Sequence, residues 1–385
     1  MSTIAVLGTY DSKGHELDFV ARRIAARGHV PLRIDVGTLE PPVVTPDVPR
    51  EAILDFSGVS DRRDRGACVA AMAAAGWFLG VLRGGGGGGT AIGTAAMRAL
   101  PVGFPKVMVS TLASGNTAPY VGTTDIVMFP SIVDVAGLNR VSRLLFSRAA
   151  GAICGMVEAP VEVEEARPLV VASMFGNTTA CVNAAKEILE KEGLEVLVFH
   201  ATGTGGRTME SMIGSGMVAG VLDVTTTEWA DELVGGILGA GPERLAAAGK
   251  MGVPAVVAPG CLDMVNFGEP STVPARFAGR TFYHHNPQVT LMRTTPAECA
   301  ELGRILAEKV NAYTGPVTVL LPLRGVSVIS AEGGPFHDAD ADAALFEAIR
   351  SRVSPHVVLR ELDCTINDPE FARACAEALL AQMRR

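Results

Sequence analysis

The chain has 385 residues, of which 48% are hydrophobic, and a formal net charge of −8. This length suits two domains of ordinary size, and the acidic balance, with no local basic patch, argues against a nucleic-acid partner. We expect a cytoplasmic protein without a membrane partner, for three reasons. The seven cysteines are scattered, and no stretch is apolar enough to span a membrane. The amino terminus runs straight into a predicted strand.

The first half alternates predicted strands and helices. A strand over 4–7 ends in a polar turn, a helix follows and stops at Gly28, and a second strand covers 31–36. After an irregular, proline-containing segment over 41–60, we predict a helix, a strand, a helix, two strands and a helix over 65–76, 77–82, 90–100, 107–109, 125–129 and 135–152. This alternation predicts an open parallel sheet, in which ligands bind beyond the carboxyl ends of the strands.

Six consecutive glycines, Gly84 to Gly89, stand between the predicted strand 77–82 and the helix 90–100. Without Cβ atoms, several backbone N–H groups of such a loop can turn toward one anion, and the dipole of the following helix favours negative charge at the same place. We interpret the run as a phosphate cradle; the alternative is a flexible linker. The run matches neither a P-loop, which needs a lysine after the last glycine, nor an ordinary dinucleotide motif.

Polar residues at other strand ends of this half would share an edge with the glycines. Asp35 stands about where an acid meets a ribose in nucleotide-binding folds, and its alternative is an acid exposed to water at a strand end. The predicted cofactor-binding residues are Thr9, Asp11, Lys13, Asp35, Gly84, Gly85, Gly86, Gly87, Gly88, Gly89, Thr90, Thr111 and Ser114.

The second half repeats the plan of the first. A short acidic segment over 158–167 is predicted as a linker between a nucleotide-binding domain over 1–157 and a second domain over 168–385. Strands are predicted in the second domain over 169–173, 195–199, 218–224, 255–257, 317–321 and 357–359, with helices between them. We therefore predict an α/β protein of two doubly wound, Rossmann-like domains with mainly parallel sheets.

Several of these motifs together resemble the Tm-one-like ATP-binding family, which is named for the tomato mosaic virus resistance protein and includes uncharacterised bacterial relatives. The motifs are Gly-Thr-Tyr-Asp-Ser-Lys at 8–13, the run 84–90, Gly-Asn-Thr-Thr at 176–179, Gly-Thr-Gly-Gly-Arg-Thr-Met-Glu at 203–210, Ala-Pro-Gly-Cys-Leu-Asp at 258–263 and His-His-Asn-Pro at 284–287. The resemblance covers essentially the whole chain. It implies two Rossmann-like domains, with ATP and magnesium held in the first, and it supplies no physiological reaction.

The second half also carries residues that suit a substrate site. Three predicted strand ends, 203–210, 225–228 and 259–263, would lie on one edge of a parallel sheet. There Arg207 would hold an anionic group, and Glu228 or a histidine from the connection before Gln288 would move a proton. The predicted catalytic residues are Arg207, Glu228, Asp263, His284 and His285; the alternative is that they serve turns and caps. No histidine spacing supports a protein-only metal site, and Cys261 is interpreted as a buried thiol.

Two functions stay open at this point. One is an ATP-dependent enzyme acting on a small anionic metabolite, and the other is a nucleotide-dependent regulatory or protein-binding module without catalysis. Gly, Thr, Arg and His at strand ends favour the enzyme, because an interaction surface would need aromatic anchors and aromatic residues make up only 5% of the chain. We also expect a homodimer, since closed two-fold assemblies are common.

Overall fold

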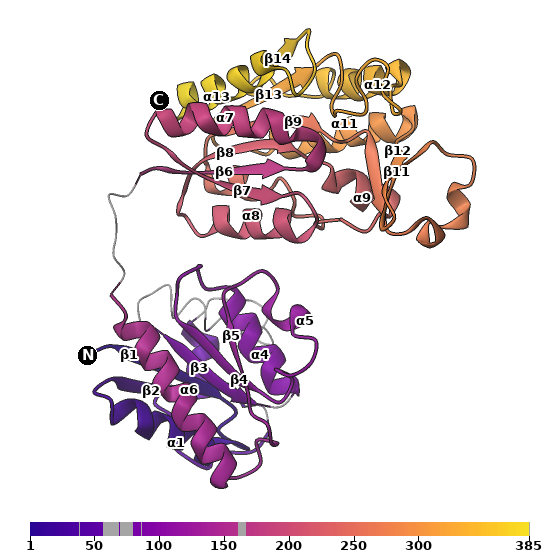
Figure 1. The fold of residues 1–385 in the computed structure, drawn as a ribbon. Helices are drawn as coiled ribbons and strands as arrows, with labels where there is room; N and C mark the ends of the chain where they lie inside the picture. Colours follow the sequence, from indigo (N-terminus) through magenta and orange to yellow (C-terminus); the bar gives the residue numbers. More distant parts are fainter. Residues whose placement is uncertain (38, 57–68, 70–79, 86, 161–166, 385) are drawn as a thin grey trace. The chain divides into compact units, whose positions relative to one another are not determined.

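The computed structural model describes residues 1–37, 39–56, 69, 80–85, 87–160 and 167–384. The chain divides into two compact units, Met1–Val163 and Glu164–Arg385 (Figure 1). Each unit is a doubly wound α/β structure with a parallel sheet, so the fold class predicted from the sequence is confirmed. In the described part of the chain, no helix combines the length and the apolar character needed to cross a membrane.

The first unit is built on a five-stranded parallel sheet in the order β2-β1-β3-β4-β5. Its strands are β1 (Thr3–Gly8), β2 (Val30–Asp35), β3 (Val81–Gly85), β4 (Lys106–Ser110) and β5 (Val127–Pro130). Apolar side chains of α1 (Gly14–Ala25) and α6 (Arg140–Glu158) pack on one face of this sheet. Those of α2 (Arg50–Phe56) and α4 (Gly87–Arg98) pack on the other, and the short helix α5 (Ala118–Val121) follows β4.

The structure corrects several predicted bounds in this unit. The glycine run is not a long loop, because Gly84 and Gly85 end β3 and α4 begins at Gly87. Helix α2 lies within the segment predicted to be irregular. Helix α6 begins later than predicted, because the Asn139 side chain caps it by accepting hydrogen bonds from the backbone N–H groups of Val141 and Ser142. The helix predicted over 65–76 falls outside the described residues, apart from residue 69.

The second unit has a six-stranded parallel sheet in the order β14-β13-β9-β8-β6-β7. Its strands are β6 (Leu169–Met174), β7 (Glu195–His200), β8 (Val218–Thr225), β9 (Ala255–Gly260), β13 (Val317–Pro322) and β14 (Val358–Leu362). One face packs against α7 (Thr179–Lys191) and α13 (Pro369–Met383). The other packs against α8 (Thr204–Gly214), α9 (Glu228–Val234), α10 (Ala247–Met251), α11 (Pro296–Asn311) and α12 (Ala339–Arg350).

A small antiparallel sheet interrupts the alternation of the second unit after β9. It has the order β10-β12-β11, with β10 (Met264–Phe267), β11 (Phe282–Asn286) and β12 (Val289–Arg293). The sequence predicted only a connection in this region. The two histidines of the His-His-Asn-Pro motif therefore belong to a strand, β11, and both are exposed to solvent.

Candidate functional site

The first sheet reverses its direction of winding at β1. The chain moves from β1 to β2 on one side, then returns to the other side with β3, β4 and β5. The segments that follow β1 and β3 therefore start next to each other at the carboxyl edge of the sheet. Ligands of open α/β proteins bind at this kind of switch point.

The residues predicted to bind a cofactor lie at, or just after, the carboxyl ends of β1 to β4. Thr9, Asp11 and Lys13 come after β1, and Asp35 ends β2. The glycines run from the last two residues of β3 into the first turn of α4, which also contains Thr90, although Gly86 lies outside the described residues. Thr111 and Ser114 follow β4 and are exposed, whereas the hydroxyl of Thr90 is buried against that of Ser110 at 2.7 Å. The structure thus places these residues along one edge of one sheet.

Glycine stands at two positions of this edge, Gly8 and Gly88, for different physical reasons. A Cβ at Gly8 would lie 2.3 Å from a terminal methyl group of Leu17, so the present packing of α1 on β1 favours the glycine. A Cβ at Gly88 would have no atom of the described residues within 4 Å, and Gly88 is an exposed residue in the first turn of α4. Because glycine destabilises a helix by roughly 0.5–1 kcal/mol relative to alanine, helix formation disfavours a glycine here, and no contact of the described residues requires Gly88. The close approach of a ligand to the backbone would explain it.

Lys13 lies beside the end of β3. Its side chain and Gly84 line the same narrow cavity, together with Leu17 and Phe146. The Lys13 ammonium donates to the backbone carbonyl of Val135. The ammonium therefore has only an uncharged partner among the described contacts, and an anion at the β1–β3 edge would compete for it.

The acids at this edge share an arginine that sequence reasoning missed. Asp35 is buried, which rules out the alternative of an acid exposed to water. Its Oδ1 accepts hydrogen bonds from the N–H groups of Tyr10 (3.0 Å) and Gly37 (2.8 Å), and its Oδ2 accepts one from Arg50 Nε (3.1 Å). Arg50 Nη1 also lies 3.9 Å from the carboxylate of Asp11. The proline before Arg50 is the sequence feature that could have predicted a helix start at this residue, since proline favours helix starts.

A buried ion cluster, which we call the Arg244 cluster, lies at the end of β8 in the second unit. Arg244 is 1% exposed, and its guanidinium makes five hydrogen bonds. It donates to both carboxylate oxygens of Asp223, to Glu228 at 2.6 Å, to Glu210 at 3.2 Å and to the carbonyl of Thr225 at 3.1 Å. An arginine in a Gly-Pro-Glu-Arg segment looks like an exposed turn residue, so no local pattern predicts this role.

Glu228 connects the Arg244 cluster to the turn between β7 and α8. Its Oε1 accepts hydrogen bonds from the N–H groups of Gly203 (2.7 Å) and Gly206 (3.0 Å). A Cβ at Gly206 would lie 2.1 Å from Glu228 Oε2, so this close approach requires glycine. Burial raises the pKa of Glu228, and Arg244 opposes that shift. Both oxygens of this carboxylate therefore have partners inside the unit.

The other predicted catalytic residues lie in different surroundings. Arg207 is exposed and donates to the carbonyl of Gly239 at 3.0 Å. Asp263 is buried; its Oδ2 accepts a hydrogen bond from Ser327 (2.8 Å), and burial raises its pKa to about 6 against the opposing charge of Arg293. Within the contacts of the described residues, nothing links Arg207, Asp263 and the histidines of β11 to Glu228.

The second sheet has its own switch point, between β6 and β8, and the chain itself covers that point. The carbonyl of Asn177, just after β6, accepts hydrogen bonds from Val328 N–H (3.3 Å) and Asn367 Nδ2 (2.8 Å). The Asn177 amide in turn contacts the sulfur of Met264 at 3.7 Å. Segments after β9, β13 and β14 therefore meet where a ligand would approach. Across the described ranges of both units, no group of three His, Cys, Asp or Glu side chains is placed to hold a metal ion.

These features define a doubly wound α/β protein with two units of like topology. The chain belongs to the uncharacterised protein family UPF0261, whose N-terminal domain matches residues 2–162 and whose C-terminal domain matches residues 167–383. A UPF0261 protein of Rhizobium meliloti (strain 1021) is 49% identical over 98% of both chains, and one of Clostridium tetani is 48% identical over 99% of both.

The resemblance predicted from the motifs is also confirmed. The ToMV resistance protein Tm-1 of Solanum lycopersicum is 44% identical over 311 residues, which cover 79% of this chain and 41% of the tomato protein. Among solved structures, MurG of Acinetobacter baumannii aligns with 98% of this chain at 10% identity and a TM-score of 0.23, a likeness too low to bear on function.

Proposed function

We propose that the first unit binds ATP with magnesium at the edge between β1 and β3, and that the protein is an enzyme acting on a small anionic metabolite. Gly88 carries this proposal. It is an exposed glycine with no described atom within 4 Å of an added Cβ, in the first turn of α4, at the switch point of the sheet. The N–H groups of a first helical turn have no acceptors inside the helix, and the helix dipole favours anions there.

The residues at the edge fit a nucleotide phosphate. N–H groups at the start of α4 would donate to phosphate oxygens, and Lys13 would exchange the carbonyl of Val135 for a charged acceptor. Magnesium in such sites is held mainly by phosphates and water with one or two carboxylates, and Asp11 is a carboxylate at this edge. Bound ATP would supply a phosphoryl group, while these residues orient it.

The same edge would also serve a nucleotide-dependent regulatory module without catalysis. The two functions differ in one observable: an enzyme consumes ATP when its metabolite is present, and a regulator releases it unchanged. The homodimer and the cytoplasmic location stay predictions from the sequence.

The first test of the proposal is calorimetry with ATP and magnesium. Lys13→Ala is expected to weaken binding by about 1.5–3 kcal/mol, because it removes a charged hydrogen-bond donor. Lys186→Ala is the matched control, since Lys186 lies in α7 of the second unit and pairs with Glu190. Absence of ATP binding by the unaltered protein would refute the proposal. Equal affinities of the Lys13 variant and the unaltered protein would remove Lys13 from the site.

A second test separates folding from binding at Gly88. Gly88→Ala is expected to keep or slightly raise the free energy of unfolding, by up to about 1 kcal/mol, while lowering ATP affinity at least about tenfold, since the new methyl group would occupy the approach to the backbone. Gly155→Ala is the control, because Gly155 is also a helical glycine with no described atom within 4 Å of an added Cβ, near the far end of α6. It should gain stability without losing affinity. Tight ATP binding by the Gly88 variant would place the phosphates elsewhere.

A further inference from the structure

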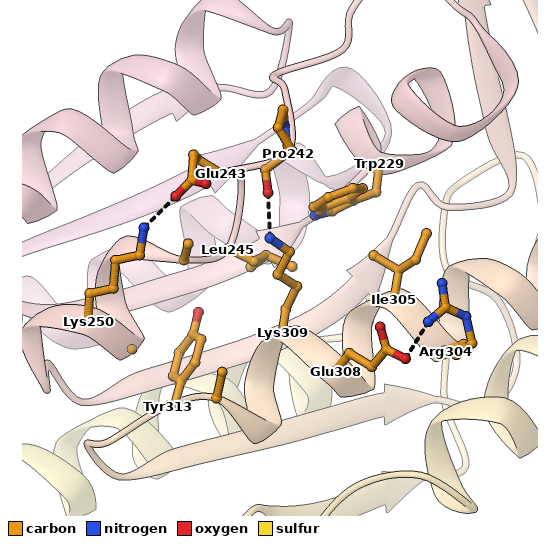
Figure 2. Close-up of a pocket in the computed structure, with 13 residues that line it drawn as sticks. Trp229, Pro242, Glu243, Leu245, Lys250, Arg304, Ile305, Glu308, Lys309 and Tyr313 are labelled. Atoms are coloured by element: carbon orange, nitrogen blue, oxygen red, sulfur yellow. Dashed lines mark hydrogen bonds and ion pairs between the residues drawn. The ribbon is translucent and has the colours of Figure 1, made fainter. Parts of the chain in front are cut away.

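We propose that a groove beside α10 and α11 binds a small molecule with an apolar body and one carboxylate. This groove, the α10–α11 groove, is lined by Trp229, Pro242, Leu245, Ile305, Lys309 and Tyr313, among others (Figure 2). Its volume is about 570 Å³, which lies within the range of roughly 300–1,000 Å³ typical of small-molecule sites. The groove belongs to the second unit, so it is distinct from the proposed nucleotide edge.

One wall of the groove holds a hydrogen-bond donor without an acceptor. Trp229 is 8% exposed, and its indole N–H is buried with no partner among the residues that the structure describes. A buried indole N–H normally has an acceptor, because its lost hydration is otherwise uncompensated. Figure 2 shows the indole nitrogen on the side of the ring that faces Lys309. A ligand atom that accepts a hydrogen bond here would satisfy this donor.

The charges in the groove favour an anion at the same place. Lys250 pairs with Glu243, and Arg304 pairs with Glu301 and Glu308. Lys309 instead donates to the carbonyl of Pro242 and lies 5.0 Å from the centre of the Trp229 ring. Within the described ranges it is the basic residue of the groove without an ion pair. One ammonium and one indole N–H together match the two oxygens of a single carboxylate.

The rest of the groove suits an apolar body. Leu245, Ile305 and the ring of Tyr313 lie around the two donors in Figure 2. Leu245 has a φ of 65°, a backbone conformation that costs energy for a leucine, and its N–H donates to Glu210 at 2.7 Å. A ligand packed on Leu245 would therefore contact the segment that carries Arg244 into the Arg244 cluster.

The test compares a carboxylate with its uncharged analogue on the full chain. The probes are 3-phenylpropionate and 3-phenylpropionamide, and the readout is the NMR resonance of the Trp229 indole N–H. The chain has two tryptophans, and Trp77→Phe assigns the second signal. The carboxylate is expected to move the Trp229 resonance saturably to lower field, whereas the amide should bind at least about tenfold more weakly.

Two lysine variants test whether Lys309 binds the carboxylate of the probe. Lys309→Met keeps the apolar stem and removes the ammonium, so affinity for 3-phenylpropionate is expected to fall about tenfold. Lys186→Met, at a lysine of α7 that lies outside the groove and also has an acidic partner, should leave the affinity unchanged. The proposal is overturned if millimolar carboxylate leaves the Trp229 resonance in place, if the amide binds equally well, or if Lys309→Met binds as the unaltered protein does. The comparison of acid with amide decides the matter even if a variant fails to fold, and it does not depend on ATP binding.

Discussion

Replacing Arg244 with methionine is expected to lower the free energy of unfolding of the second unit by about 3–5 kcal/mol. The side chain is almost fully buried and compensates three carboxylates, those of Glu210, Asp223 and Glu228. Methionine fills a similar volume but leaves these acids without a cation. They would have to take up protons or admit water, and both options cost stability. Urea denaturation followed by circular dichroism measures the loss.

Arg324→Met provides the matched control for Arg244. Arg324 also binds a carboxylate through two nitrogens, at 2.7 and 2.6 Å from Asp363, but both partners are exposed. Water replaces an exposed partner readily, so this variant should unfold at nearly the same urea concentration as the unaltered protein. Equal midpoints for the two variants would show that the Arg244 cluster contributes no more than a surface ion pair.

The stability of the second unit is expected to fall as the pH rises from about 4 to about 7, because of Asp231. Burial raises the pKa of this carboxyl from its ordinary 3.8 to about 7, although hydrogen bonds from Asn266 and Leu238 oppose the shift. Between these values the unfolded chain has released the proton while the folded unit still holds it. Each pH unit in this window therefore removes about 1.4 kcal/mol of stability, or about 4 kcal/mol across it.

The donors around Asp231 suit the ionised form, but Asn266 can offer an acceptor to a neutral carboxyl. The side-chain amide of Asn266 donates to Asp231 Oδ2 at 2.6 Å, and its own oxygen is buried without a partner in the described part of the chain. Rotating that amide by half a turn would bring Asn266 Oδ1 to the proton on Asp231. In this rotated orientation, Asn266 Oδ1 would accept a hydrogen bond from protonated Asp231.

Asp231→Asn tests this account by removing the titrating group with little change of shape. Between about pH 5 and about pH 8, the variant is expected to lose roughly 3 kcal/mol less stability than the unaltered protein. Glu232→Gln, at an exposed neighbour in α9, serves as the control and should follow the unaltered protein. Parallel stability curves for the Asp231 variant and the unaltered protein would contradict the prediction.

The large sheets could be predicted from the sequence because their strands are short apolar runs between turn residues. The run 169–173 is an example, and β6 covers Leu169–Met174. The antiparallel sheet could not be predicted in the same way. Its strand β11 contains His284, His285 and Asn286, and its stability depends on pairing with β12 rather than on a local pattern.

The sequence located the edge of the candidate site but not the contacts within it. Residues such as Lys13 and Gly88 were predicted because strand ends of a parallel sheet meet at one edge. Arg50 and Arg244 were missed because an arginine's partners are decided by distant segments. Asp35, for example, is buried through contacts with Tyr10 and Arg50, residues far from it in the chain.

The coverage of the second switch point by Asn177 and its partners has a thermodynamic consequence. The loops at the carboxyl edge of the second sheet form hydrogen bonds with one another. The free energy of folding of the second unit therefore already includes these contacts. In the first unit no described atom lies within 4 Å of a Cβ added at Gly88, and a molecule that bound there would add its binding free energy to the folded state alone. ATP bound at this edge would therefore raise the unfolding temperature of the first unit as its concentration rises.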